Sequence, residues 1–414
     1  MMWNKLNALK VIALSSLFIT FSECRSNLFR LIMVALICLG STTLSGQTGT
    51  IHYVREGGSG SKTGIDWANA AGDLQAMINA AQAGDKIYVA KGHYYAMEVG
   101  EMVTDEQGLG TKARQKSFVM KSGVSVYGGF AGKDGETPAT RAKKVGALYK
   151  WQLANETVLS GEHKVVGESG TTDHWHFDTL KQQWIPSGYL QDNSLHVVWF
   201  ASNGFKSPTV VNEATEANPL GAKTVLDGFV IEKGAADGEA ADEGILGSSA
   251  RFGGGVYLVE NGVLRNCIVR ENYALTRGGG VFVNSGGQIS DCFIERNASP
   301  GSTANRNGFG GGVYVLGKGK IERSFLVSNS ARMGGGIYLS KDQQALPYEM
   351  QVEMSIIANN SAFHEGGGVY CDNGGVLTAL TIVYNHTLSA LSSLYGKSGG
   401  IFCNGYGVIT NSVL

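Results

Sequence analysis

Phe252-Gly-Gly-Gly-Val-Tyr-Leu-Val259 is the first of six near-copies of one phrase in the second half of this 414-residue chain. The others are Gly278-Gly-Gly-Val-Phe-Val283, Gly310-Gly-Gly-Val-Tyr-Val315, Gly334-Gly-Gly-Ile-Tyr-Leu339, Gly366-Gly-Gly-Val-Tyr-Cys371 and Gly399-Gly-Ile-Phe-Cys403. The triplets begin about 25, 32, 24 and 32 residues apart, and a period of this size is typical of solenoids. Each unit of a solenoid buries its apolar face by stacking on the next unit, so the repeat predicts a stack of coils.

The repeat units have the composition of strands rather than helices. Short runs of Val, Ile, Tyr and Phe are separated by Gly and Asn, which favours strands joined by turns. We expect three strands per coil, in the first unit Val256–Val259, Val263–Arg265 and Cys267–Arg270. Strands of successive coils would pair in parallel, and crossovers between parallel strands are nearly always right-handed. The predicted fold is therefore all-β, a right-handed parallel β-helix solenoid.

The first half of the chain predicts an N-terminal helix/strand cap on this solenoid. Asp73 is the expected N-cap of a helix over residues 73–81, in which Leu74, Met77 and Ile78 share one face. The division expected along the chain is an export segment at 1–46, the cap with irregular early coils and long insertions at 47–225, and regular coils at 226–414.

An aromatic column runs through the repeats and is the first candidate binding surface. Its members are Tyr257, Phe282, Tyr314, Tyr338, Tyr370 and Phe402. They alternate with two aliphatic columns that we expect to face inward, so the rings should face outward and offer a platform for sugar rings. Two other arrangements fit the same pattern: a stacking ladder beneath covering loops, or core residues if the register is reversed.

Asparagines and cysteines also recur at equivalent positions. Asn272, Asn297, Asn329 and Asn360 each end a coil at the same corner. Stacked amides hydrogen-bond along the axis as a ladder, and Asn tolerates the left-handed turn, so we expect a structural role. Cys267 lies above Cys292 in one column, and Cys371 above Cys403 in another, within the range of a disulfide. Because Ser324 and Leu339 fill the same columns elsewhere, free thiols are preferred over disulfides.

Charged residues give few signs of catalysis. Arg270 is equivalent to Glu295, and Glu271 to Arg296, so we expect cross-coil ion pairs on an exposed strand. The alternative makes an arginine the base of a polysaccharide β-elimination. Asp173–Asp178 is the densest group of His and Asp, yet it resembles an insertion hairpin, and no metal is expected there. No motif for a nucleophile elbow, a phosphate loop or a zinc protease occurs. We therefore predict no catalytic residue, no metal and no cofactor.

Bulk properties fit an exported protein. The net charge is -1 and no basic block occurs, which argues against nucleic-acid binding. Val11–Phe21 and Leu31–Leu39 are apolar but short for a bilayer span. The second is followed by small residues, in the order of a secretory signal, while an anchored hairpin of both stretches is the alternative. Thr410–Leu414 reads as the start of a further strand, so we expect the natural protein to continue.

Four parts of the sequence together resemble pectin-lyase-like right-handed parallel β-helix proteins. They are the Gly84-Asp-Lys-Ile-Tyr-Val89 segment, the Tyr127-Gly-Gly-Phe130 turn, the Leu226-Asp-Gly-Phe-Val-Ile231 segment and the Gly-Gly-Gly-Val-Tyr coils. Within that group they are similar to surface proteins of Bacteroidetes type, and the repeats are similar to those of polymorphic outer-membrane proteins. The resemblance covers about residues 51–414. It implies an exported, monomeric rod at the cell surface, associated with the outer membrane through a C-terminal anchor.

The resemblance leaves the activity open, because this fold carries adhesins, lyases and hydrolases alike. We expect a cell-surface scaffold for adhesion that binds glycans or surface proteins of a host or the environment. A polysaccharide lyase or glycoside hydrolase on the same fold, and a passive structural spacer, are the alternatives.

Overall fold

The computed structural model describes residues 49–96, 114, 116–162, 174–178, 183–187, 193–200, 221–238, 250–301, 307–341, 345–388 and 398–414. For 174–178 and 183–187 it describes the backbone alone. Gly49–Leu414 forms one compact unit. The expectations for the export segment at 1–46 lie outside the described residues.

The Gly49–Leu414 unit contains four parallel sheets, called A, B, C and D. Within one coil the chain passes through them in the order A, B, D, C, and they are described in that order. Sheet A consists of β1 (Ile51–Val54), β2 (Lys86–Ala90), β5 (Ser125–Phe130), β10 (Thr224–Asp227), β14 (Gly262–Arg265), β18 (Gly287–Ser290), β22 (Gly319–Glu322), β26 (Met350–Glu353), β30 (Val376–Thr378) and β34 (Val408–Thr410). Sheet B consists of β3 (Gly92–Tyr95), β6 (Thr157–Ser160), β11 (Val230–Glu232), β15 (Ile268–Arg270), β19 (Phe293–Glu295), β23 (Phe325–Val327), β27 (Ile356–Ala358) and β31 (Thr381–Val383).

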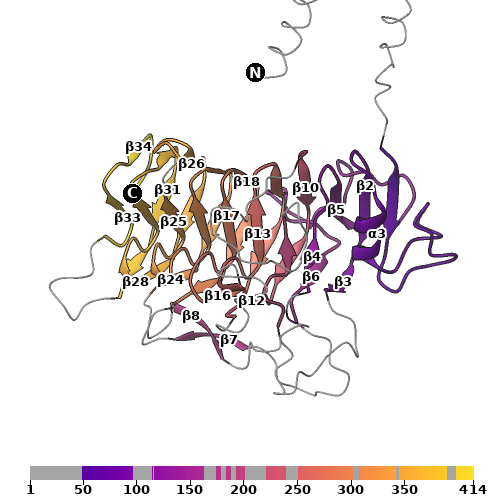
Figure 1. The fold of residues 1–414 in the computed structure, drawn as a ribbon, viewed down its shortest axis with the longest axis horizontal. Helices are drawn as coiled ribbons and strands as arrows, with labels where there is room; N and C mark the ends of the chain where they lie inside the picture. The colour runs from indigo at the N-terminus through magenta and orange to yellow at the C-terminus, as the bar shows by residue number, and fades with distance from the viewer. Residues whose placement is uncertain are drawn as a thin grey trace, which may run out of the picture. The chain divides into compact units, whose positions relative to one another are not determined.

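Sheets D and C complete each coil. Sheet D consists of β12 (Ala235–Ala236), β16 (Tyr273–Ala274), β20 (Ala298–Ser299), β24 (Ser330–Met333), β28 (Ser361–Glu365) and β32 (His386–Thr387). Sheet C consists of β4 (Phe118–Val119), β9 (Val198–Trp199), β13 (Val256–Val259), β17 (Val281–Asn284), β21 (Val313–Leu316), β25 (Ile337–Ser340), β29 (Val369–Asp372) and β33 (Ile401–Asn404). Figure 1 shows β13, β17 and β25 in this order along the stack, and β21 lies between the last two.

The predicted right-handed parallel β-helix is confirmed by the pairing of the strands. Every pair within the four sheets is parallel, and the repeated phrases lie in register, as Val256 with Val281 and Val281 with Val313 show. The expectation of three strands per coil was wrong, because a short fourth strand follows the asparagine corner. In the first regular coil this strand is β16. It was missed because two residues are too few to show an alternating pattern.

The corner between sheets B and D is made by residues in the left-handed backbone region. Glu271 and Arg296 occupy this corner in successive coils, with φ values of 57° and 50°. The buried Asn272 and Asn297 follow them directly. Since the left-handed residue turns the chain sharply, its own side chain stays at the surface, beside the outer face of sheet B.

A helix covers the N-terminal end of the stack, as predicted. The helix α3 (Leu74–Ala80) begins after Asp73, whose carboxylate accepts a hydrogen bond of 2.9 Å from the Ala76 amide. Leu74, Met77 and Ile78 are buried and join the core that continues through all coils. Among the described residues, none of the helices is both long and apolar enough for a membrane span.

The strands β7 (His174–Asp178) and β8 (Gln183–Ser187) pair with each other in antiparallel fashion and belong to none of the four parallel sheets. This is the arrangement predicted for an insertion hairpin. The side chains of its histidines lie outside the described residues. In the described part of the chain, no three His, Cys, Asp or Glu side chains gather closely enough to hold a metal ion.

Candidate functional site

The aromatic column lies on the outer side of sheet C, but its rings are covered. Leu258 lies against Gly262 and Gly287 of the neighbouring sheet, so it faces the interior and the alternating Tyr257 faces outward. Nevertheless, five of the six rings are only 1% to 5% exposed, and Phe402 is half-buried. Neighbouring rings stack with centroids 4.7 Å apart between Tyr338 and Tyr370 and 5.2 Å apart between Tyr314 and Tyr338.

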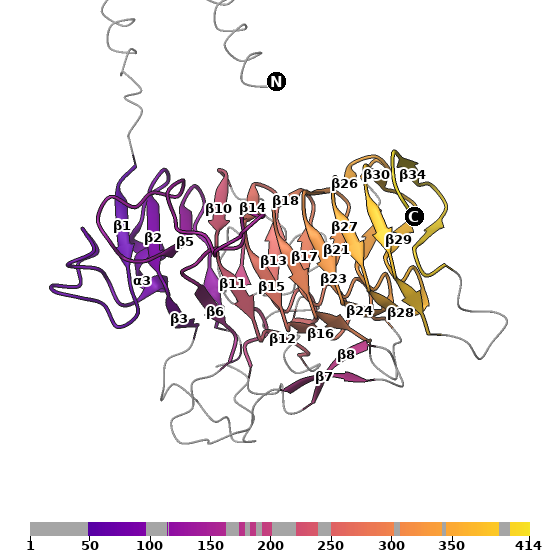
Figure 2. The same cartoon turned by 180° about the vertical axis from the view of Figure 1, so that it is seen from behind.

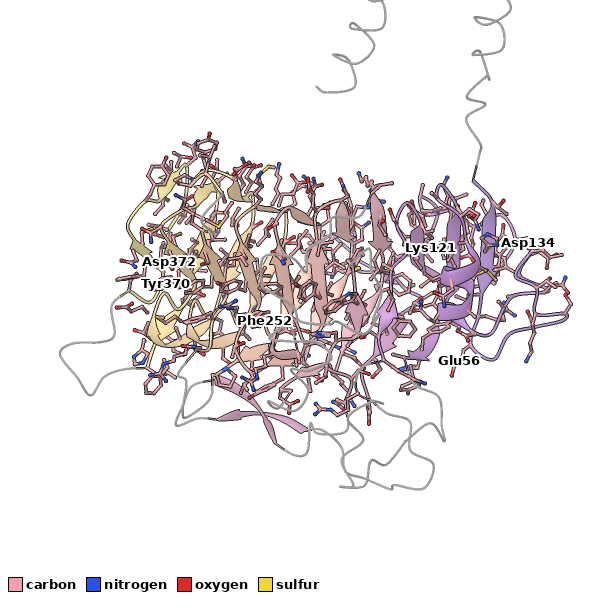
Figure 3. The ribbon with its side chains drawn as sticks, in the orientation of Figure 1. Glu56, Lys121, Asp134, Phe252, Tyr370 and Asp372 are labelled. Atoms are coloured by element: carbon pink, nitrogen blue, oxygen red, sulfur yellow. The ribbon has the colours of Figure 1, made fainter. Side chains whose placement is uncertain are left out.

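Covering residues explain why these outward rings are buried. The guanidinium of Arg277 lies 4.6 Å from the ring centroid of Phe252 and 5.5 Å from that of Tyr314. Phe309 packs at 4.9 Å from the Tyr338 ring. Figure 3 shows Tyr370 near Asp372 at one end of the stack and Phe252 farther along it. From Tyr257 to Tyr370 the geometry is that of a covered stacking ladder, in which the rings pack against one another and against covering residues.

The asparagine corner forms a continuous ladder of amides. Asn272 donates from its side chain to Oδ1 of Asn297 at 3.0 Å, and Asn297 donates in the same way to Asn329 at 3.0 Å. The series continues from Asn329 to Asn360 at 3.0 Å and from Asn360 to Asn385 at 2.9 Å. Each amide also binds main-chain groups in the buried corner, so the ladder ties each coil to the next.

The two cysteine pairs are free thiols in this structure. Cys267 and Cys292 are fully buried, and burial raises the pKa of Cys292. Cys371 is buried beside the exposed Cys403 in the next coil. A hydrogen bond between these two thiols raises the pKa of Cys371 and lowers that of Cys403 to about 7. The thiols thus differ in exposure although both pairs lie in stacked columns.

The outer face of sheet B carries the strongest candidate for a site, and its strands can be followed in Figure 2. In each strand the middle residue is buried, as Ile231, Val269 and Ile294 are, so its two neighbours point outward. The last outward position reads Ser160, Glu232, Arg270, Glu295, Val327, Ala358 and Val383 from β6 to β31. This column changes from charged to uncharged side chains midway along the stack.

We call Glu232, Arg270, Glu295 and the corner residues Glu271 and Arg296 the charged row. Arg270 Nη2 lies 2.7 Å from Glu232 Oε2. Arg296 binds Glu271 across coils at 3.0 Å and Glu295 of its own coil at 2.8 Å. Of the two predicted cross-coil pairs, the one between Glu271 and Arg296 forms. Arg270 instead binds Glu232, its in-register neighbour on the other side, and Glu295 is bound by Arg296.

Protonation in the charged row disfavours the arginine-base mechanism. Burial lowers the pKa of Arg270, but the charge and hydrogen bond of Glu232 outweigh it and hold the pKa above its usual value. A guanidinium that stays charged and holds a carboxylate is a poor proton acceptor. Burial also raises the pKa of the Glu295 carboxyl, against the lowering effects of Arg296 and Arg270.

An aromatic cluster stands beside the charged row on the same face. The segment between β5 and β6, residues 131–156, crosses sheet B and places Tyr149 and Trp151 over β19 and β23. Their rings stack in parallel at 4.6 Å, and Trp151 lies 5.9 Å from the Phe293 ring. Phe325 meets Tyr149 edge-on at 4.7 Å. Trp151 is 8% exposed, whereas Tyr149 is 37% exposed and turns part of its ring to solvent.

Buried and surface ion pairs hold the 131–156 segment in place. Arg141 binds Asp227 of β10 at 2.7 Å, and both side chains are buried. Farther along, Lys144 binds Glu156 at 2.6 Å and Lys150 binds Asp291 at 3.2 Å. Tyr149 is therefore presented on a fixed support rather than on a loose tip.

This cluster was not predicted from the sequence. Tyr149 and Trp151 fall among the long insertions expected within 47–225, and the contacts that form the cluster join residues far apart in the chain. The available signal was local: Leu148-Tyr149-Lys150-Trp151 is an apolar group inside an otherwise polar insertion. Such a group in a loop indicates packing against a partner surface.

Comparison with known proteins shows a likeness of fold. No protein-family model and no curated protein matches the chain. Among solved structures, pectate lyase Pel9A is 11% identical, with 88% of this chain and 78% of that chain covered and a TM-score of 0.38. The protein ybhc of Escherichia coli is 12% identical, with 87% and 84% covered and a TM-score of 0.35. XylC, solved in complex with xylose, is 11% identical, with 87% and 69% covered and a TM-score of 0.31.

These values carry no argument about activity, and the assignment of the fold depends on the strand pairing itself. The finer likenesses, to surface proteins of Bacteroidetes type and to polymorphic outer-membrane proteins, stay predictions. At the level of fold, the pairing of its strands makes this chain a right-handed parallel β-helix protein.

Proposed function

We propose that this protein is an exported scaffold that binds a polysaccharide chain along the outer face of sheet B. The observation that carries the proposal is the half-exposed Tyr149 ring, fixed on Trp151 beside the charged row. An exposed aromatic ring on a rigid support is the usual partner of a sugar ring, and neighbouring charged groups offer hydrogen bonds to hydroxyls.

The dimensions of sheet B support an extended polymer as the ligand. Equivalent positions in successive coils repeat about every 4.8 Å, close to the length of one sugar residue in an extended chain. The aromatic cluster and the charged row occupy outward positions two residues apart on each strand, about 7 Å from one another. A chain running along the stack would therefore meet ring contacts on one side and polar groups on the other.

Two parts of the proposal depend on the sequence. Export is proposed from the export segment expected at 1–46, and attachment to the cell surface is part of the proposed adhesive role. Catalysis is not included, because the charged row lacks a free proton acceptor of the kind that a lyase requires.

The test is affinity electrophoresis of the chain through gels that contain single polysaccharides, with Tyr149→Ala beside it. We expect retardation by at least one polymer and a loss of affinity of at least about tenfold in the variant, since stacking on a ring contributes about 1.4 kcal/mol or more. Tyr348→Ala is the matched control, because Tyr348 is 53% exposed and lies outside sheet B. Equal retardation of wild type and Tyr149→Ala would place the binding elsewhere and refute the proposed face.

A further inference from the structure

The cations on the outer face of sheet B are already held by carboxylates. In the charged row, Arg270 binds Glu232 at 2.7 Å, and Arg296 binds both Glu271 and Glu295 at 3.0 Å and 2.8 Å. Each guanidinium thus already donates hydrogen bonds to carboxylates of the protein itself. A carboxylate or sulfate of a ligand would have to displace one of these partners.

Cations are also held by carboxylates where the 131–156 segment meets sheet B. Lys144 binds Glu156, and Lys150 binds Asp291. Arg323 also binds Asp291, at 3.0 Å. At the neighbouring corner between sheets B and D, Lys233 binds Glu162. Each of these four cations is therefore held by a carboxylate of the protein.

The carboxylates of the charged row would also repel a polyanion. Glu232 and Glu295 flank Arg270 in the column, and Glu271 lies at the adjacent corner. A polymer that carries a negative charge on each sugar would bring several anions near these groups at once. Glu295 is largely buried, so little water lies around its carboxylate to screen this repulsion.

Resting on the proposed function, we infer that the polysaccharide bound along sheet B is neutral, and not a polyuronate or a sulfated polymer. Its hydroxyls donate to the outer oxygens of the paired carboxylates and accept from the remaining guanidinium N–H groups, without breaking the pairs. Specificity arises from stacking on Tyr149 and from this network, and long-range charge attraction contributes little.

The test compares glucomannan and xyloglucan with polygalacturonate and iota-carrageenan by affinity electrophoresis and titration calorimetry, at about 0.05 M and about 0.5 M NaCl. We expect binding of a neutral polymer whose dissociation constant changes by less than about twofold with salt, and polyanion binding at least about tenfold weaker. Tighter polyanion binding that weakens steeply with salt and is lost in Tyr149→Ala overturns the inference but keeps the binding face. Failure of all four polymers to bind counts against the binding function itself.

A gain of function provides the second test. Glu271→Gln removes one negative partner of Arg296, so polygalacturonate and iota-carrageenan should bind at least about fivefold more tightly than they bind wild type. Glu349→Gln is the matched control, because Glu349 pairs with Lys318 at 3.1 Å outside sheet B and should give no gain. An equal response of the two variants, or none in Glu271→Gln, contradicts the role assigned to the paired charges.

Discussion

Replacing Asn329 by alanine should destabilise the solenoid strongly, because this residue stands in the middle of the asparagine ladder and is 1% exposed. Its side chain donates to Ile294 O at 2.9 Å and to Asn360 Oδ1 at 3.0 Å. Its Oδ1 accepts from the Asn297 main-chain and side-chain amides, both at 3.0 Å. In Asn329→Ala the buried Ile294 carbonyl loses a donor and the Asn297 N–H loses its acceptor. Two such groups at about 1 to 3 kcal/mol each give a loss of about 3 kcal/mol.

Urea unfolding followed by circular dichroism measures this loss through the transition midpoint and slope. The control is Asn404→Ala, since Asn404 is exposed and its amide reaches only Asp372, at 3.2 Å. The control should lose less than about 0.5 kcal/mol. A loss in Asn329→Ala no larger than that of the control would refute the view that the amide ladder ties the coils together.

Three further outcomes follow from buried or half-buried groups. Burial lowers the pKa of His196 from 6.5 to about 4. Below pH 6.5 the His196 imidazole therefore takes up a proton in the unfolded chain but not yet in the folded one. About 3 kcal/mol of the free energy of unfolding that is present above pH 6.5 should be lost by about pH 4. His196→Gln should remove this slope from unfolding curves taken across that range, and an unchanged slope contradicts the assignment. Asp227→Ala leaves the buried Arg141 without its partner, so about 3 to 5 kcal/mol should be lost and limited proteolysis near Lys143 should accelerate; unaltered cleavage would count against the anchoring role. Iodoacetamide at neutral pH should label Cys403 well before Cys267 and Cys292, as read by peptide mass spectrometry, because Cys403 is exposed and its pKa is about 7; early labelling of the buried pair would contradict their burial.

The repeated phrases of the sequence were sufficient to predict the stack of coils. Residues that occupy equivalent positions in the repeats, such as Val256 and Val281, pair in register. The helix after Asp73 was predictable for a different reason, because its cap and its apolar face are both encoded within a few residues. In both cases the local sequence pattern favours the same structure as the overall fold.

The binding face was not predictable in this manner. Alternation correctly turned Tyr257 outward, but whether an outward ring is open or covered depends on residues such as Phe252 and Arg277, whose positions only the folded chain defines. Conversely, Tyr149 lies in an insertion without periodicity, and its support comes from Phe325 far along the chain. Arg270 likewise has an in-register glutamate on each side, and only the folded chain shows that it binds Glu232 while Arg296 binds Glu295.

The most direct measurement of the central claim is a crystal structure of the chain soaked with mannohexaose or cellohexaose as neutral probes. The account predicts a sugar ring stacked on Tyr149, with the oligosaccharide running along the stack, across the strands of sheet B, beside Glu295 and Arg296. Sugar bound on a different face, with the Tyr149 ring left uncovered, would contradict it.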